Sequence, residues 1–140
     1  MTTLRKLIEL KLIEADLGFK EIAGAADLSA IVEGRTAYPA CHLFRQHRNG
    51  KGNDMANIVR QEVKEGVTLV VVTKNVRDKR GGDSSDENET YCQKIQDALL
   101  GWTPDERFNA LEYGGGGLVN FKNSLFVWQE TYETTTQIRS

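Results

Sequence analysis

The chain has 140 residues, of which 39% are hydrophobic and 27% are charged, a balance typical of a soluble globular protein rather than a disordered one. This length suits one compact domain, residues 1–140, which buries roughly two-thirds of the surface that its unfolded form exposes. A net charge of −2 gives no field that attracts nucleic acid or an anionic membrane, and no apolar run approaches the ~20 residues that span a bilayer.

The first predicted element is a helix that Thr2 or Thr3 can cap and that runs to about Asp16. Its apolar residues recur at the spacing of one helical face. They are Leu4, Leu7, Ile8 and Leu12. Gly18 is placed to end the helix. A helix with a single apolar stripe is expected to cover a sheet.

A short strand over 19–23 and a helical turn over 26–33 are expected next. The segment 37–46, AYPACHLFRQ, has the pattern of a strand, and its Pro39 favours an edge position or the start of the strand. Residues 45–57, RQHRNGKGNDMAN, are polar, contain turn residues and show no apolar period. We therefore predict a projecting loop there.

The clearest strand pattern covers residues 57–75, NIVRQEVKEGVTLVVVTKN. Apolar side chains occupy most odd positions from Val59 to Val71 and polar ones most even positions, so one face is expected to be buried and the other wet. At 70–72 both faces become apolar, which predicts cover on both sides, by helices or by another subunit. Gly66 is a candidate for a bulge.

The second half of the chain is expected to contain a loop, a helix and a hairpin. Asp86 and Glu89 form a capping-box pattern for a helix over 87–100. From Phe108 the pattern is that of a hairpin with a turn at 122–124. This order of elements implies an α+β domain with a mostly antiparallel sheet, two long helices packed on one face, and a final hairpin.

No residue pattern predicts a catalytic, cofactor or metal site. The glycines at 114–117 lack the following Lys-Ser/Thr and helix of a phosphate loop, so we interpret them as a kink or bulge in a hairpin strand. His42 and His47 have no recognisable nucleophile beside them. The acidic residues before the second helix lack the spacing of a calcium loop. Cys41 and Cys92 are interpreted as buried free thiols.

Two basic segments and one aromatic stripe are the remaining candidates for function. The basic residues are Arg45, His47, Arg48 and Lys51 in the first segment and Arg77, Lys79 and Arg80 in the second. These segments are either ordinary solvated loops or surfaces that contact partner subunits or passing DNA, and composition alone leaves both readings open. On the last strand Phe126, Trp128 and Tyr132 alternate, which favours buried or interfacial area.

The order of the elements and several strings resemble the tail-terminator proteins of long-tailed bacteriophages and related prophages. The strings are Gly24–Cys41 (GAADLSAIVEGRTAYPAC), Val67–Gly81 (VTLVVVTKNVRDKRG), Ala98–Pro104 (ALLGWTP) and Leu111–Arg139. The resemblance covers nearly the whole chain. It implies a small α+β protein, not an enzyme, that forms a homohexameric ring, caps the growing tail tube, stops its polymerisation and offers a surface for joining the head.

The partners that the resemblance implies are further copies of the chain, the tail tube protein and the head-completion or connector protein. DNA would pass through the lumen without sequence-specific binding, and no membrane is involved. The implied location is the virion tail at the head–tail junction, after assembly in the host cytoplasm.

Two alternatives remain open from sequence. One is another neck or tail structural component, such as a head-closure or tube protein, which would differ by stacking into filaments rather than closing into rings. The other is a small cytosolic enzyme or ligand-binding domain, which would need a pocket of convergent polar groups that the sequence does not predict.

Overall fold

The computed structural model describes the whole chain except residues 28, 30–36, 54 and 78–79. The elements in the described part are α1 (Leu4–Ala15), β1 (Glu21–Gly24), β2 (Ala40–Gly50), β3 (Arg60–Lys74), α3 (Gly82–Leu99), β4 (Glu112–Lys122) and β5 (Leu125–Arg139). The strands form one sheet in the order β1-β2-β3-β5-β4. Only the β1–β2 pair is parallel among these neighbours, and the other three pairs are antiparallel.

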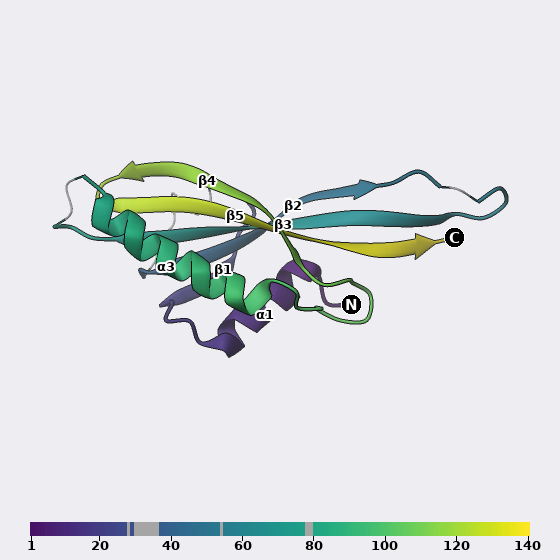
Figure 1. Ribbon diagram of the computed structural model, residues 1–140, viewed down its shortest axis with the longest axis horizontal. Coiled ribbons are helices and arrows are strands. Elements are labelled where there is room, and N and C mark those ends of the chain that lie inside the picture. The colour runs from purple at the N-terminus through teal and green to yellow at the C-terminus, as the bar shows by residue number, and fades with distance from the viewer. Residues whose placement is uncertain (28, 30–36, 54, 78–79) are drawn as a thin grey trace.

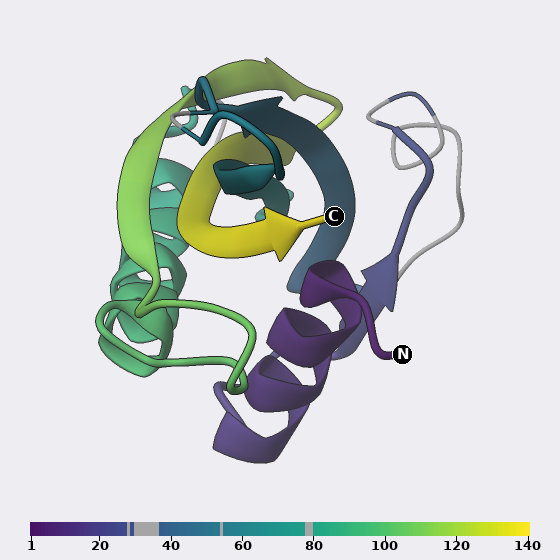
Figure 2. The same ribbon diagram turned by 90° about the vertical axis from the view of Figure 1, so that its right-hand side faces the viewer.

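Both helices lie on one face of this sheet, and β4 and β5 form the final hairpin (Figure 1). The sheet coils strongly about the long axis of the molecule (Figure 2). The predicted α+β class, with a mostly antiparallel sheet and two helices on one face, is therefore confirmed. In the part of the chain that the structure describes, no helix is long and apolar enough to cross a membrane.

The first helix forms nearly as its sequence predicts. The hydroxyl Oγ1 of Thr3 accepts a hydrogen bond from the backbone N–H of Lys6 at 3.2 Å, which satisfies one of the free donors of the first turn. The helix ends at Ala15 because Asp16 adopts a left-handed conformation, with φ of 51°. Gly18, the predicted terminator, follows two positions later with φ of 96°.

The second helix begins at Gly82 rather than at residue 87, so the predicted capping box is wrong. Gly81 precedes it in a left-handed conformation, with φ of 83°, and no side chain caps the first turn. Asp86 lies inside the helix, where its backbone carbonyl accepts a bond from the Thr90 hydroxyl at 3.1 Å. Gly81 can adopt this left-handed conformation because it has no Cβ. A search for capping side chains does not detect a helix start of this kind.

The main core lies between the helices and the sheet. Its largest fully buried side chains come mainly from both helices, from the odd positions of β3 and, with Tyr132, from β5. They include Leu4, Ile8, Leu12, Leu69, Val71, Ile95, Leu99 and Tyr132. On the opposite face of the sheet, Val70, Val72 and Val127 are buried beside the partly buried Tyr38 and Phe44. The predicted burial of both faces is therefore confirmed, but on this second face side chains such as Tyr38 and Phe44 supply the cover, and neither α1 nor α3 lies over it.

The long central hairpin departs most from prediction. Pro39 directly precedes β2, as expected of a strand start, but β2 continues to Gly50 through much of the segment that we predicted as a loop. The register shift lies on β2 between Arg45 and His47, opposite Gly66, so the bulge belongs to β2 and not to Gly66. A Cβ at Gly66 would lie 2.2 Å from the His47 ring, and the glycine therefore leaves space for that imidazole.

The remaining predictions concern short elements. The short strand forms at Glu21–Gly24 rather than at 19–23, and the helical turn expected over 26–33 lies mostly outside the described residues, which include only 26, 27 and 29 of it. The final turn is confirmed, since Asn123 and Ser124 both have positive φ, as the tightest hairpin turns require. The glycine run also behaves as predicted, because the β4 register shifts between Tyr113 and Gly115.

Candidate assembly surfaces

The central strands extend well beyond the two helices and form what we call the arm (Figure 1). The arm consists of residues 45–50 of β2, 60–66 of β3 and 133–139 of β5. The helices cover the opposite half of the same strands. A 15-residue strand such as β3 spans roughly 50 Å at ~3.3 Å per residue, so the arm and the helix-covered body form two distinct ends of the molecule.

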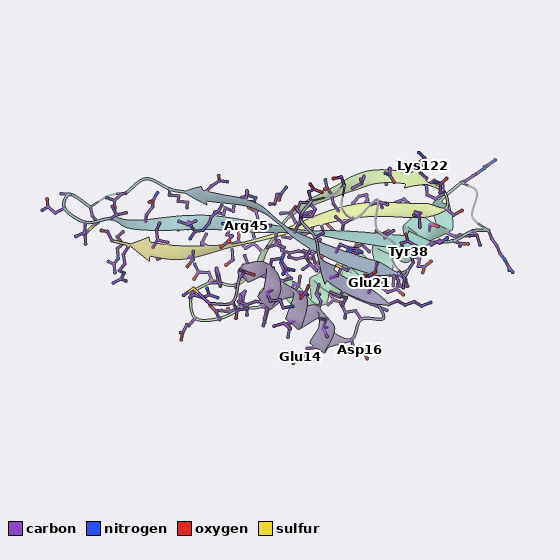
Figure 3. The ribbon with its side chains drawn as sticks, turned by 180° about the vertical axis from the view of Figure 1, so that it is seen from behind. Glu14, Asp16, Glu21, Tyr38, Arg45 and Lys122 are labelled. Atoms are coloured by element: carbon purple, nitrogen blue, oxygen red, sulfur yellow. The ribbon has the colours of Figure 1, made fainter. Side chains whose placement is uncertain are left out.

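The first basic segment is mostly strand, which corrects our prediction of a loop. Arg45, His47 and Arg48 lie on β2 within the arm, and Lys51 directly follows β2. Figure 3 shows Arg45 near the point where the arm leaves the body. The loop pattern arose because both faces of the arm are largely solvated there. A strand without a buried face needs no alternation of apolar and polar residues.

These cations face carboxylates on the neighbouring strands. The Nε atoms of Arg45 and Arg48 each lie 4.0 Å from an oxygen of Glu65. On the other face, His47 Nε2 lies 3.4 Å and Lys64 Nζ 3.5 Å from the same Glu133 oxygen. Lys51 Nζ lies 3.4 Å from Glu62. Exposed pairs of this kind contribute only ~0–1 kcal/mol each, but they make the arm a surface of mixed charge rather than a basic one.

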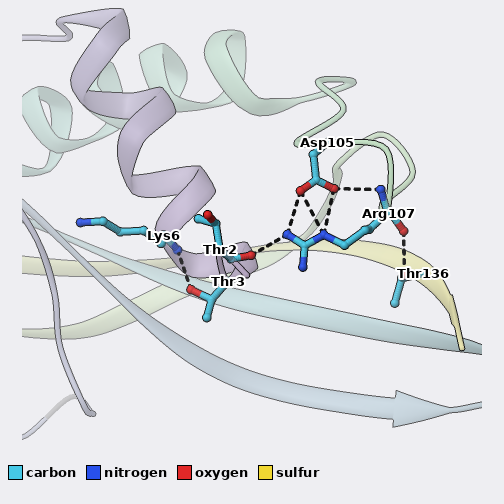
Figure 4. A network of polar contacts seen from close by, with 6 residues as sticks. All are labelled: Thr2, Thr3, Lys6, Asp105, Arg107 and Thr136. Atoms are coloured by element: carbon cyan, nitrogen blue, oxygen red, sulfur yellow. Dashed lines mark hydrogen bonds and ion pairs between the residues drawn. The ribbon is translucent and has the colours of Figure 1, made fainter.

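A hollow of about 740 Å³ lies under the base of the arm, between it, the start of α1 and the segment 106–109. Arg107 joins these parts (Figure 4). Its guanidinium pairs with Asp105 at 2.7 Å and donates to the backbone carbonyl of Thr2, while its own carbonyl accepts from the hydroxyl of Thr136. The hydrogen bonds from Arg107 lower the pKa of Asp105 below its usual value.

The second basic segment lies at the other end of the molecule. Arg77 and Arg80 are exposed in the connection between β3 and α3, and Lys79 lies outside the described residues. β3 separates this connection from the arm along most of its length. The structure therefore does not bring the two basic segments together into one surface.

The three aromatic residues of β5 divide between core and groove. Tyr132 is fully buried in the main core, so it offers no surface to a neighbour, and we leave it out of the interface. Phe126 and Trp128 instead line a groove of about 320 Å³ between α3 and β5. Glu89 and Glu130 also line it, with Ser85, Asn88, Cys92, Gln93 and Gln96. Because its charged residues are both acidic, we call it the acidic groove.

Buried polar residues that sequence reasoning missed lie beside this groove. Glu130 is 7% exposed and accepts a hydrogen bond from the hydroxyl of Tyr113. The Asn88 amide donates to the carbonyl of Val71 at 2.9 Å, and the Cys92 thiol lies 3.4 Å from its oxygen. No sequence motif contains Asn88 or Glu130, because their partners Val71 and Tyr113 are each 17 positions away in the chain.

The thiols of Cys41 and Cys92 and the imidazole of His42 are buried in the fold. Burial raises the pKa of the Cys92 thiol to about 12 and raises the pKa of Cys41 further, so neither thiol is a ready nucleophile. Burial lowers the pKa of His42, which lies on the sheet face opposite Cys41. Within residues 1–27, 29, 37–53, 55–77 and 80–140, no group of three or more metal-ligating side chains gathers.

Comparison with known proteins identifies the family of this chain. The model of the phage tail terminator protein family matches residues 5–140. The chain belongs to the phage tail terminator family. It is thus a structural protein of the virion tail and not an enzyme.

A solved structure supports the same fold for this tail terminator family member. A chain from the virion of a native gene transfer agent particle shares 10% sequence identity with it at a TM-score of 0.62. The likeness covers 96% of this chain and 95% of the other. No curated protein matches it.

Proposed function

We propose that this protein closes into a homohexameric ring that caps the tail tube, stops tube polymerisation and provides the surface at which the head joins. The observation that carries the proposal is the arm. In a member of the terminator family, three strands extend past the helices that would cover them and, apart from the part of β5 that contacts residues 107–109, leave the arm open for contacts outside the subunit.

A closed ring needs two different, complementary surfaces on each subunit, because every contact is head-to-tail. This chain has two dissimilar ends. One is the arm, with mixed charge and no helix over it; the other is the body, where α3 and β5 border the acidic groove. Two unlike ends on one elongated subunit support a ring rather than a two-fold dimer.

The charge distribution supports a channel that lets DNA slide. The net charge is −2, and the arginines near the base of the arm face Glu65. Tight non-specific binding to DNA depends on many unpaired cations that release counterions. A subunit with balanced charges would line a lumen without holding the DNA that passes.

The proposed partners are further copies of the chain, the tail tube protein and a head-completion or connector protein, at the head–tail junction. The test combines the purified chain with the tube protein during tube polymerisation. We expect closed rings of fixed mass and tubes that stop growing when the protein is added. Filaments of this chain, or tubes whose length does not respond to it, would contradict the proposal.

A further inference from the structure

The acidic groove has carboxylates but no positively charged side chain among its described lining residues. Glu89 and Glu130 line it, and no Lys, Arg or His is among its described lining residues. Neither carboxylate forms an ion pair with any residue that the structure describes, although Glu130 is only 7% exposed. A buried carboxylate is costly without a cation, and the neutral Tyr113 hydroxyl and Cys92 thiol beside Glu130 compensate it only in part.

The walls of the groove suit a cationic side chain with an apolar stem. Trp128 is half-buried in it beside Phe126, and an indole face is the strongest aromatic partner of a cation. The volume of about 320 Å³ lies near the lower end of the ~300–1,000 Å³ range of ligand pockets. The groove therefore has room for few side chains, and its chemistry is that of an arginine or lysine site.

The tip of the arm, in contrast, has an excess of positive charge. Arg60 and Arg139 are directly opposite each other on β3 and β5, and both are exposed. Like charges in this position repel. Among the described residues neither side chain has an acidic partner. Exposed apolar side chains surround them, with Ile58 at 52%, Val59 at 39% and Ile138 at 36% exposure.

Within the described part of the chain, the groove lacks a cation and the arginines of the tip lack a carboxylate partner. We therefore infer that the arm tip of one subunit docks into the acidic groove of the next copy in the ring. The arginines would supply the cations that Glu89 and Glu130 lack, while the apolar residues of the tip would cover the exposed part of Trp128. Tip and groove lie at opposite ends of the molecule, so the contact is head-to-tail, as ring closure requires. The inference rests on the proposed ring and assigns the surfaces that close it.

The test measures self-association of the full chain by light scattering and sedimentation across a concentration range. We expect Arg60→Glu and Glu89→Arg each to weaken self-association at least tenfold. The double variant should recover most of that loss, because the charges are exchanged rather than removed. Two variants at exposed sites outside both surfaces, Lys20→Glu and Asp86→Arg, make matched charge changes and should associate like the wild type.

Glu130→Gln separates a docking role from a structural one. Glutamine keeps an acceptor for Tyr113 and removes a buried charge, so the isolated subunit should unfold at the same or a higher denaturant midpoint. Arg60→Glu should likewise not destabilise the subunit, since it replaces repulsion across the strands with attraction. Both variants should nevertheless weaken assembly. A substitution at a residue that only maintains the fold would lower both the denaturant midpoint and the self-association.

The outcomes separate this contact from the ring itself. Wild-type rings that Arg60→Glu and Glu89→Arg leave intact would overturn the docking and leave the ring standing. A double variant no better than the singles would also overturn it, as would variants that alter binding to the tube protein but not self-association. A wild-type chain that stays monomeric, alone and with tube protein, would overturn both.

Discussion

The side-chain amide of Asn88 donates a hydrogen bond to the main-chain carbonyl of Val71, with 2.9 Å between nitrogen and oxygen. Asn88 is 1% exposed, and the same nitrogen lies 3.3 Å from the Thr73 hydroxyl. One helix side chain thus joins α3 to the central strand β3. The contact fixes the position of the helix that borders the acidic groove.

Replacing Asn88 with alanine should lower the free energy of unfolding by about 2 kcal/mol, because the strand groups beneath it lose their buried donor. Urea denaturation followed by circular dichroism measures the change. Gln93→Ala is the matched control: within the described part of the chain its amide bonds only to Asp97, in an exposed position, so its effect should stay within about 0.5 kcal/mol. Equal losses in the two variants would show that the Asn88 contact is not important for stability.

Two neighbouring glycines of β4 should respond differently to substitution by alanine. A Cβ at Gly116 would lie 2.2 Å from a Glu130 oxygen and 2.9 Å from the backbone oxygen of Gln129, whereas a Cβ at Gly117 meets nothing within 4 Å. Gly116→Ala should therefore destabilise the protein by about 1–3 kcal/mol. Gly117→Ala should be neutral or slightly stabilising, since alanine restricts the unfolded chain. Thermal unfolding of both variants checks this, and a larger loss at Gly117 would contradict it.

The buried carboxylate of Glu9 should make stability depend on pH in the acid range. Burial raises the pKa of Glu9, but the hydrogen bonds and the positive charges of Lys6 and Arg5 together outweigh burial and hold the pKa below its usual value. A group with a lowered folded pKa stabilises the fold above its unfolded pKa, and this contribution disappears as the pH falls through the folded value.

The wild type should therefore exceed Glu9→Gln in stability by roughly 1 kcal/mol at neutral pH, and the difference should shrink steadily as the pH falls below the ordinary pKa of 4.5. Denaturation midpoints between pH 7 and pH 3 measure it. Glu14→Gln removes an exposed carboxylate from the same helix and is the matched control. A gap between wild type and Glu9→Gln that persists at pH 3 would contradict the assignment.

Both cysteines should resist alkylation in the folded protein. Cys41 is fully buried, Cys92 is 7% exposed, and burial raises the pKa of each thiol, to about 12 for Cys92. Since the thiolate is the reactive form, labelling at pH 8 should be at least about a hundredfold slower than for the unfolded chain. Mass spectrometry after timed exposure to iodoacetamide measures the rate. Rapid labelling without denaturant would show that the core opens readily.

The sequence predicted well those elements whose signals are local. The Thr3 cap and the stripe Leu4, Ile8 and Leu12 define α1, and the positive-φ turn at Asn123 and Ser124 defines the last hairpin. Each depends on residues close in sequence, so a pattern is sufficient to find it. The sheet class followed from the order of these elements.

The prediction failed where the decisive contact is distant or made by the backbone. The arm strand from Arg45 to Gly50 has no buried face, and only its pairing with β3 makes it a strand. The start of α3 depends on the left-handed Gly81. The acidic groove needs Glu89 and Trp128 together, 39 positions apart in the chain. No local motif predicts that proximity.

The most direct test of the account is the mass of the purified wild-type protein, measured by light scattering and negative-stain imaging in the presence of tail tube protein. Ring closure predicts particles of a single mass with six copies of this chain, visible as closed rings at the ends of tubes. Monomers bound singly to tube ends, or open polymers that lengthen with protein concentration, would contradict it.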